Sequence, residues 1–180
     1  MDEKRARFDA EILPHLDAAY RFAKWLSRSP SDAEDVVQEA VLRAFRGFEG
    51  RRGGDAKAWL LTIVRNCHLT AVMQQRRRAQ VPLPEEHDTH DGHVMVATDD
   101  PEAASIEADQ AMILERLLST LSDDYREVLV LREIEDMGYR DIAAVTNLPI
   151  GTVMSRLARA RAALKASWQR EAKGDVHVMP

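Results

Sequence analysis

The sequence predicts an all-α fold made of two small helical domains joined by a flexible acidic linker. Residues 1–79 and 105–173 carry apolar side chains at three- and four-residue spacing, the pattern of amphipathic helices. No segment shows the alternation of a half-buried strand. Residues 80–104 contain three prolines, many acidic residues and no apolar period, which is the composition of an extended linker.

The net charge of −5 hides an uneven distribution along the chain. Residues 1–80 hold 15 basic and 11 acidic side chains, whereas residues 81–120 hold one basic and ten acidic ones. Residues 121–180 hold nine of each. This asymmetry indicates separate modules with different partners.

The composition also argues against several classes of protein. The apolar fraction of 45% is typical of a globular chain, and the most apolar run, residues 58–64, is too short to cross a bilayer. The amino terminus lacks the apolar stretch of a secretory signal, and Cys67 is the single cysteine, so no internal disulfide can form. We therefore expect a cytoplasmic protein without direct membrane insertion.

Three helices are expected in the first block. The first has an apolar face, and Ser31 with Glu34 forms a capping-box pattern at the start of the second. Four glycines within residues 47–55 end the second helix, because glycine is entropically costly in a helix. The third starts near Asp55 and runs to the basic residues 76–78. The face of the first helix comprises Phe8, Ile12, Leu16, Ala19, Ala23 and Leu26.

The second block predicts a helix-turn-helix. Ser122 is a plausible cap for the helix that follows it, and residues 139–145 form a further short helix. Asn147 stands where a reversing chain needs a left-handed backbone, and Pro149 can begin the next helix, which runs from about Ile150. Two helices joined by such a short turn are typical of DNA-binding motifs.

The last helix separates an apolar face from a basic one on a 100° wheel. From Ile150 to Lys173 there are six basic residues and one acidic residue, and a helix that contacts phosphates gains from this imbalance. Arg159 can reach a guanine edge, so the pattern predicts DNA binding rather than a merely solvated basic helix. The core side holds Val153, Leu157, Ala160 and Leu164; the outer side holds Met154, Ser155, Ala158 and Arg159, bordered by Thr152 and Arg156.

Two long motifs resemble a known family. "DAEDVVQEAVLRAFRGF" at 32–48, followed by "AWLLTIVRNCHLTAVMQQRRR", resembles region 2 of the bacterial sigma-70 family of RNA polymerase sigma factors. Residues 121–164 resemble region 4 of the same family. Both motifs in this order, with only a short tether between them, are similar to the extracytoplasmic-function (ECF) subfamily. The resemblance implies region 2 at 1–79, the linker at 80–104, region 4 at 105–173 and a tail at 174–180.

The resemblance implies a protein that binds core RNA polymerase and directs promoter recognition and transcription initiation. In this family the region 2 helix docks on the clamp helices of the largest polymerase subunit. An acidic docking face explains the acids of this helix, since charge complementarity guides subunit pairing. Acids at a helix start also favour the helix dipole, but that effect does not reach Glu39. The positions that match the docking helix are Asp35, Gln38, Glu39, Leu42 and Arg43.

The third helix resembles the element that opens the −10 promoter sequence. Opening costs base unstacking, so the protein must offer a pocket for a flipped base and cations for the single strand. Asn66 matches the base-contacting asparagine of the family. Trp59 resembles a platform on which a base stacks, but its place in the apolar pattern favours a buried position in the core. The resemblance nominates Arg51, Arg52, Lys57, Trp59, Thr62, Arg65 and Asn66 for −10 binding.

The resemblance also nominates residues that face the −35 element. The helical wheel independently selects four of them, namely the four outer-side residues. Met154 departs from the family, in which Lys or Arg is common at this position, and Asn147 replaces a frequent glycine. The −35 set comprises Arg132, Thr152, Met154, Ser155, Arg156, Ala158 and Arg159.

The linker has two interpretations. In the family it is thought to thread the channel through which the transcript leaves the polymerase, and a solubilising tether would have the same composition. His87, His90 and His93 recur every three residues and could hold a divalent metal, but flexible linkers lack the local order that zinc needs. We expect no cofactor.

Two other functions remain as alternatives. A helix-turn-helix regulator without a sigma role would share the second block, but it gives no reason for a −10-opening helix. A sigma-like decoy that captures an anti-sigma factor would have no need of basic residues on its recognition helix. No nucleophile–base pair or P-loop is present, so we do not expect an enzyme. The resemblance implies core RNA polymerase, promoter DNA and a regulatory anti-sigma factor as partners.

Overall fold

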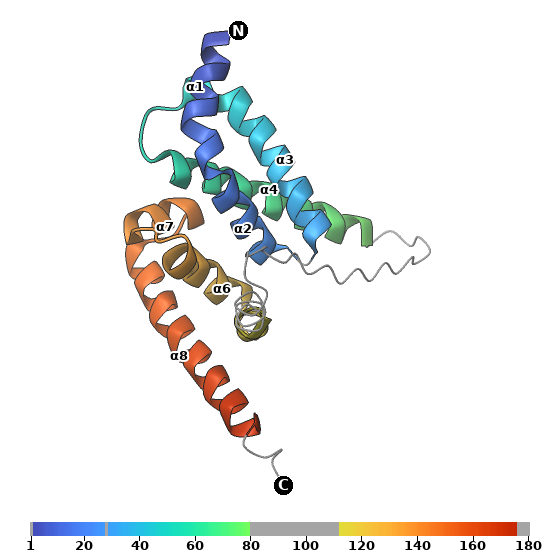
Figure 1. Ribbon diagram of the computed structural model, residues 1–180, viewed down its shortest axis with the longest axis vertical. Coiled ribbons are helices and arrows are strands. Elements are labelled where there is room, and N and C mark those ends of the chain that lie inside the picture. Colours follow the sequence, from blue (N-terminus) through green and yellow to red (C-terminus); the bar gives the residue numbers. More distant parts are fainter. Residues whose placement is uncertain (1, 28, 80–111, 176–180) are drawn as a thin grey trace, which may run out of the picture.

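The structure, a computed structural model, describes residues 2–27, 29–79 and 112–175. Across these residues it contains helices and turns and no strand, so the all-α prediction is confirmed. Figure 1 shows an amino-terminal unit of four α-helices and a carboxyl-terminal unit that ends in one long helix, with the two units in contact.

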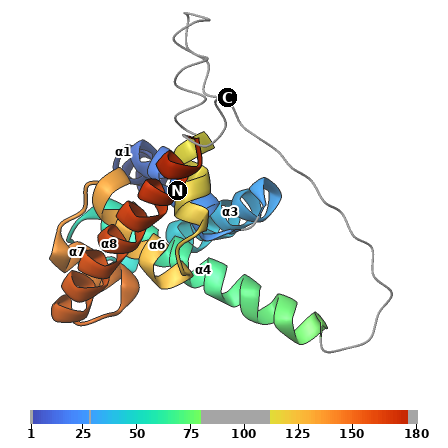
Figure 2. The same ribbon diagram turned by 90° about the horizontal axis from the view of Figure 1, so that it is seen from below.

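The amino-terminal unit is built around α4, which packs against α2 and α3. Short 3-10 turns join α1 to α2 and follow α3. The carboxyl-terminal part of α4 extends away from the rest of the protein (Figure 2), which explains why Met73 is 64% exposed although it continues the apolar pattern. The elements are α1 Asp2–Ile12, η1 Leu13–His15, α2 Leu16–Leu26, α3 Pro30–Gly47, η2 Phe48–Gly50 and α4 Ala56–Ala79.

Two helix boundaries differ from the sequence-based expectation. The first predicted helix is split at Pro14, because proline lacks an N–H and its ring disturbs the preceding turn. The second predicted helix, α3, is capped by Ser29 rather than by Ser31. The Ser29 hydroxyl accepts a hydrogen bond from the backbone N–H of Asp32 at 3.1 Å, and Pro30 occupies the first helical position.

The carboxyl-terminal unit contains the predicted helix-turn-helix. Its first described segment, residues 112–119, is helical, and a π-helical turn, η3, follows α6. The long helix α8 ends two residues beyond the boundary predicted for region 4, and the predicted linker lies outside the described residues. The elements are α6 Asp123–Leu129, η3 Val130–Ile134, α7 Tyr139–Thr146 and α8 Ile150–Asp175.

Asn147 makes the turn between α7 and α8. Its backbone is left-handed, with φ 54° and ψ 43°, as the sequence predicted. The next residue, Leu148, donates its N–H to the carbonyl of Ala143 at 3.1 Å, which closes the end of α7. Pro149 then accepts hydrogen bonds from the first turn of α8. The turn therefore sets the angle at which α8 leaves the unit.

Replacing Asn147 by alanine should lower the free energy of unfolding by about 1–2 kcal/mol, because a Cβ-bearing residue without a short polar side chain is strained in the left-handed region. Asn147→Gly should be neutral or slightly stabilising, since glycine adopts this conformation without strain. Urea unfolding followed by circular dichroism measures both variants. Equal losses for the alanine and glycine variants would show that the backbone conformation is not the cause.

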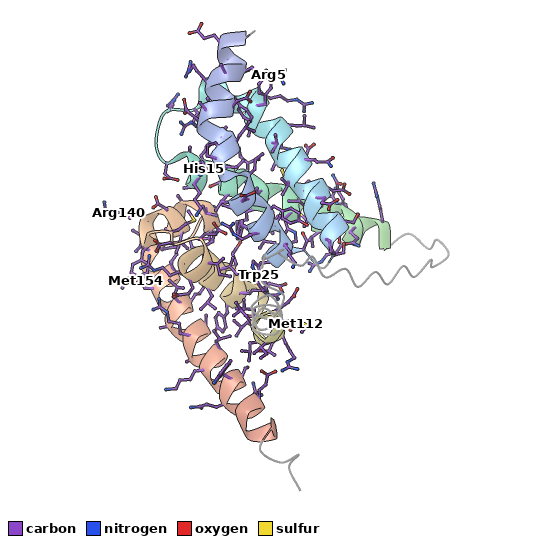
Figure 3. The ribbon with its side chains drawn as sticks, viewed as in Figure 1. Arg5, His15, Trp25, Met112, Arg140 and Met154 are labelled. Carbon is purple, nitrogen blue, oxygen red and sulfur yellow. The ribbon has the colours of Figure 1, made fainter. Side chains whose placement is uncertain are left out.

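One hydrophobic cluster extends through both units. It contains buried residues of α1 to α4 together with buried residues of α6, η3, α7 and α8. A second, smaller cluster joins residues 118–121 to α6 and α8, and Trp25 of α2 packs against it (Figure 3). The contact between the two units is therefore a packed interface, which the sequence did not predict.

Candidate functional site

The outer face of α8 matches the helical wheel. Met154 is 52% exposed and lies on the outer side of the helix (Figure 3), and the other three predicted outer residues are exposed as well. The predicted core residues Val153, Leu157 and Ala160 are buried, and Leu164 is partly buried. Because Ser155 and Ala158 are small, another molecule can approach the helix closely at this face.

The three arginines of this part of α8 differ in their partners. Arg156 forms an ion pair with Asp124 at 2.8 Å, and Arg161 forms one with Glu133 at 2.6 Å. Both pairs lie within the carboxyl-terminal unit. Within residues 2–27, 29–79 and 112–175, no carboxylate lies within ion-pair distance of Arg159. Arg159 is thus the basic side chain of this face that is most available to a ligand.

Arg132 and Thr152 are less accessible than the four outer residues. The Arg132 guanidinium donates to the backbone carbonyl of Met137 at 2.8 Å and lies 5.4 Å from the ring centroid of Tyr139. Thr152 is half-buried in the first turn of α8. Arg132 keeps a 34% exposed side chain, so it can still reach a partner at the rim of the face.

The loop before α4 holds one arginine in place and leaves another exposed. Arg51 forms an ion pair with Glu11, donates to the carbonyl of Gly54 at 3.0 Å and lies 5.8 Å from the Trp59 ring. Arg52 is exposed. Gly54 has φ +84°, a conformation that favours glycine and lets the loop fold back onto Arg51. This loop is therefore ordered by its own contacts.

Two of the nominated cations on α4 face the other unit. Lys57 forms an ion pair with Glu135, the residue that follows η3, with 2.8 Å between the ammonium and the carboxylate. Arg65 is bound to Glu127 of α6, with 2.5 Å between the two nearest atoms. Burial raises the pKa of Glu127, although the hydrogen bond and charge of Arg65 act in the opposite direction. In this arrangement both cations are engaged inside the protein.

The remaining nominated residues of α4 differ from one another. Asn66 is exposed on the helix surface. The Thr62 hydroxyl donates to the carbonyl of Ala58 at 2.8 Å, so its hydrogen bond is made within its own helix. Trp59 is half-buried and packs against the hydrophobic cluster. Of the seven residues nominated for −10 binding, Arg52 and Asn66 are the exposed ones.

The nominated docking residues form an exposed face of α3. Asp35 and Gln38 are exposed, and Leu42 is 51% exposed, which is unusual for a large apolar side chain on a packed helix. Glu39 and Arg43 form an ion pair at 2.6 Å along the same face. The opposite side of α3 is buried in the core. The face thus combines acidic, polar and apolar groups of the kind that a protein partner can cover.

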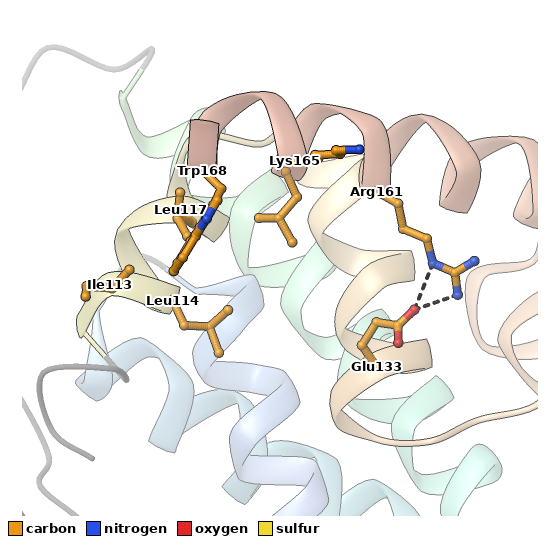
Figure 4. A pocket seen from close by; sticks show the side chains of 8 residues that line it. Ile113, Leu114, Leu117, Glu133, Arg161, Lys165 and Trp168 are labelled. Carbon is orange, nitrogen blue, oxygen red and sulfur yellow. Dashed lines mark hydrogen bonds and ion pairs between the residues drawn. The ribbon is translucent and has the colours of Figure 1, made fainter. Parts of the chain in front are cut away.

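A groove of about 680 Å³ lies between residues 112–119 and α8 (Figure 4). Leucines and the half-exposed Trp168 line one part of it, and the ion pair between Glu133 and Arg161 closes the other end. Arg161 itself is one of the residues that line the groove. Arg161 therefore belongs to the groove rather than to the outer face of α8.

The described residues hold neither a metal centre nor a membrane span. No three histidine, cysteine or carboxylate side chains among them are close enough to share a metal ion, and the candidates His87, His90 and His93 lie outside the described residues. The helices that the structure describes are also too short or too polar to cross a membrane.

The stability of the protein should depend on pH through His68 on α4. Burial lowers its pKa below the ordinary 6.5, with a smaller contribution from Arg65, while Asp123 and Asp32 act in the opposite direction. The unfolded state therefore takes up a proton first, and the free energy of unfolding should decrease as the pH falls through about 6.5. His68→Gln should flatten this decrease in urea titrations at pH 7.5 and 6.0. An unchanged slope in the variant would exclude His68 as its source.

Comparisons with known proteins agree with this geometry. Residues 12–78 match the family model for sigma-70 region 2, and residues 111–164 match that for sigma-70 region 4. The chain is 34% identical to the ECF RNA polymerase sigma-E factor of Escherichia coli over 137 residues, covering 74% of this chain and 72% of the relative. It is 33% identical to the ECF RNA polymerase sigma factor SigE of Mycolicibacterium smegmatis over 160 residues, covering 88% of this chain and 60% of that relative.

Solved structures show the same fold. The sigma factor RpoE of Bartonella quintana, solved in complex with the anti-sigma factor NepR, has a TM-score of 0.68 at 29% identity, covering 91% of this chain and 97% of RpoE. CnrH, solved with the cytosolic domain of CnrY, has a TM-score of 0.61 at 24% identity over 92% of this chain and 90% of CnrH.

Proposed function

The chain belongs to the ECF RNA polymerase sigma factors, and on that premise we propose that it binds core RNA polymerase and directs promoter-specific initiation of transcription. The observation that carries the proposal is the presence of two different exposed faces on the two units. One is the acidic and apolar face of α3, and the other is the outer face of α8 with Arg159. A sigma factor needs both, because it must contact a protein and a duplex at once.

We propose that α8 enters the major groove of the −35 element. Arg159 is its specific reader, since a guanidinium can donate two hydrogen bonds to a guanine edge. Ser155 and Ala158 allow close approach, and Met154 offers an apolar contact, such as a thymine methyl group, where relatives have a cation. Thr152, Arg132 and Arg156 lie at the border of the face and suit phosphate contacts, which fix the position of the helix.

We propose that α4 and the loop before it bind the opened −10 strand. Asn66 and Arg52 are exposed and can contact a flipped base and the strand backbone. Arg51, Lys57 and Arg65 would add cations to this surface when their carboxylate partners are released. We assign Thr62 and Trp59 a structural role in the helix and the loop rather than a contact with a base.

A binding experiment with core polymerase tests the docking face. The double variant Asp35→Lys, Leu42→Ala should weaken binding to core RNA polymerase about tenfold or more, because interface anchors typically contribute more than 1 kcal/mol each. Glu3→Lys, an equal charge change at an exposed position of α1, is the control and should bind normally. Fluorescence anisotropy of the labelled chain with purified core enzyme measures both. Equal affinities for the two variants would remove the α3 face from the proposal.

The two alternatives predict different responses to core polymerase. A helix-turn-helix regulator should bind its DNA tightly alone and gain nothing from the polymerase, whereas a decoy should not bind promoter DNA with or without it. The exposed Arg159 argues against a decoy, because a protein that does not bind DNA has no need of an exposed arginine on this face.

We also propose that a regulatory anti-sigma factor binds this chain in the cytoplasm, as NepR binds RpoE. The proposed role is recognition and requires no catalytic group or cofactor of its own.

A further inference from the structure

Two acidic residues of the carboxyl-terminal unit are buried at its contact with the amino-terminal unit. Glu127 belongs to α6 and is 6% exposed, and Glu135 follows η3 and is 3% exposed. A buried carboxylate is costly unless it is paired, so its partners show what holds it in place. In both residues, the partners come from the other unit.

Glu135 is held by two helices of the amino-terminal unit. Arg21 of α2 donates to both carboxylate oxygens, at 2.9 and 3.2 Å. Lys57 of α4 lies 2.8 Å from the carboxylate and also donates to the backbone carbonyl of Glu135 at 2.6 Å. The Glu135 side chain is fully buried, with 0% exposure. A single carboxylate thus connects α2, α4 and the end of η3.

Glu127 makes the second connection. Both of its carboxylate oxygens accept hydrogen bonds from Arg65 of α4, at 2.5 and 3.4 Å. The two side chains are 7% and 18% exposed, respectively. Lys57 and Arg65 are eight residues apart on α4 and lie toward the same neighbouring unit. They are also two of the cations nominated for the −10 strand.

We infer that Glu127 and Glu135 form an intramolecular latch that, together with the shared hydrophobic cluster, holds the two units closed, and that it occupies Lys57 and Arg65 with carboxylates in place of DNA phosphates. The identity of the displaced ligand rests on the proposed function, whereas the latch itself rests on the contacts of the closed structure. DNA binding at α4 requires the latch to open. Opening exchanges each buried ion pair for a phosphate contact on one side and a hydrated carboxylate on the other, so core polymerase and DNA can drive it.

The geometry provides matched controls for a test. Glu133 and Asp124 also belong to η3 and α6 and also pair with arginines, but their partners Arg161 and Arg156 lie in the same unit. The variant Glu127→Gln, Glu135→Gln should therefore loosen the contact between units, whereas Asp124→Asn, Glu133→Gln should leave it closed. Small-angle X-ray scattering on the free full-length chain measures this as the radius of gyration. The latch variant should have a larger radius than the wild type and the control.

A second measurement is the affinity of the chain for a dT oligonucleotide, a single strand that binds accessible cationic side chains and contains no promoter sequence. The latch variant should bind it about tenfold or more tightly than the wild type, because the fraction of chains in the open state limits the apparent affinity. Arg21→Gln should act in the same direction, since it removes a partner of Glu135 but none of the nominated −10 cations. If circular dichroism shows that the double variant is unfolded, Arg21→Gln serves as the test of the latch.

The outcomes separate the latch from the sigma role. A radius of gyration and an oligonucleotide affinity that stay at the wild-type values in the folded variants would overturn the latch, even if the chain initiates transcription. A larger radius with an increased affinity supports the latch, even if core polymerase does not respond to the chain. A larger radius without a gain in affinity would overturn the claim that the carboxylates block Lys57 and Arg65.

Discussion

Arg159→Ala is expected to lower promoter-directed transcription about 5- to 150-fold, which corresponds to the ~1–3 kcal/mol that a specific base contact contributes. Arg159 is exposed on the outer face of α8, and its guanidinium is not held by a carboxylate among the described residues. The loss should fall on promoters with the preferred −35 base opposite Arg159. Run-off transcription with core polymerase on matched promoters, with that base present or replaced, measures it.

The control for this variant is Arg170→Ala. Arg170 lies on the same helix, but it hydrogen-bonds within α8, to the Ala166 carbonyl and to Ser167. Its removal should change transcription less than twofold. If Arg159→Ala initiates as well as Arg170→Ala on every promoter, Arg159 does not read DNA, and the outer face of α8 needs another role.

Leu60→Ala is expected to lower the free energy of unfolding by about 2–5 kcal/mol, because it leaves a cavity in a packed core. Leu60 is fully buried on α4, within the cluster that extends through both units. Since whole domains are stable by only about 5–15 kcal/mol, this one change removes a large part of the stability. Urea denaturation followed by circular dichroism measures the loss.

Leu69→Ala is the matched control on the same helix. Leu69 is 42% exposed, so the same deletion should cost about 0.5 kcal/mol or less. Because the cluster continues into the other unit, the Leu60 variant should unfold in a single transition. Two separate transitions would contradict a continuous core, and equal losses for the two leucine variants would contradict the assigned burial.

The long helix α8 and the turn before it could be predicted from the sequence in detail. The apolar periodicity of α8 and its excess of basic residues depend only on nearby positions in the chain, so they can be recognised without knowledge of the tertiary structure. The apolar period predicted the burial of Val153, Leu157 and Ala160. The residue type of Asn147 and its place before Pro149 predicted its left-handed backbone. The split at Pro14 also had a signal in the sequence, since proline rarely continues a helix. The apolar spacing continues on both sides of Pro14, so periodicity alone predicts one continuous helix.

The contact between the two units could not be predicted in this way. Glu127 and Glu135 look like ordinary solvated acids, because their spacing carries no sign that they are buried. Their partners Lys57 and Arg65 are 62 to 78 residues away along the chain. A periodicity argument treats each helix by itself and cannot place one unit against the other. The family resemblance assigned both cations to DNA, and the uneven charge and the linker composition predicted separate modules. Only the folded structure, in which α4 packs against α7, shows that the same cations have Glu135 and Glu127 as partners.

Run-off transcription on genomic fragments, including the DNA upstream of the gene for this chain, tests the central claim most directly. Core polymerase supplemented with the purified chain should produce discrete transcripts that core polymerase alone does not produce. The start sites should lie downstream of a shared pair of elements at −35 and −10. Absence of any chain-dependent transcript, together with failure of the chain to co-elute with core polymerase, would contradict the assignment of this protein as a working sigma factor.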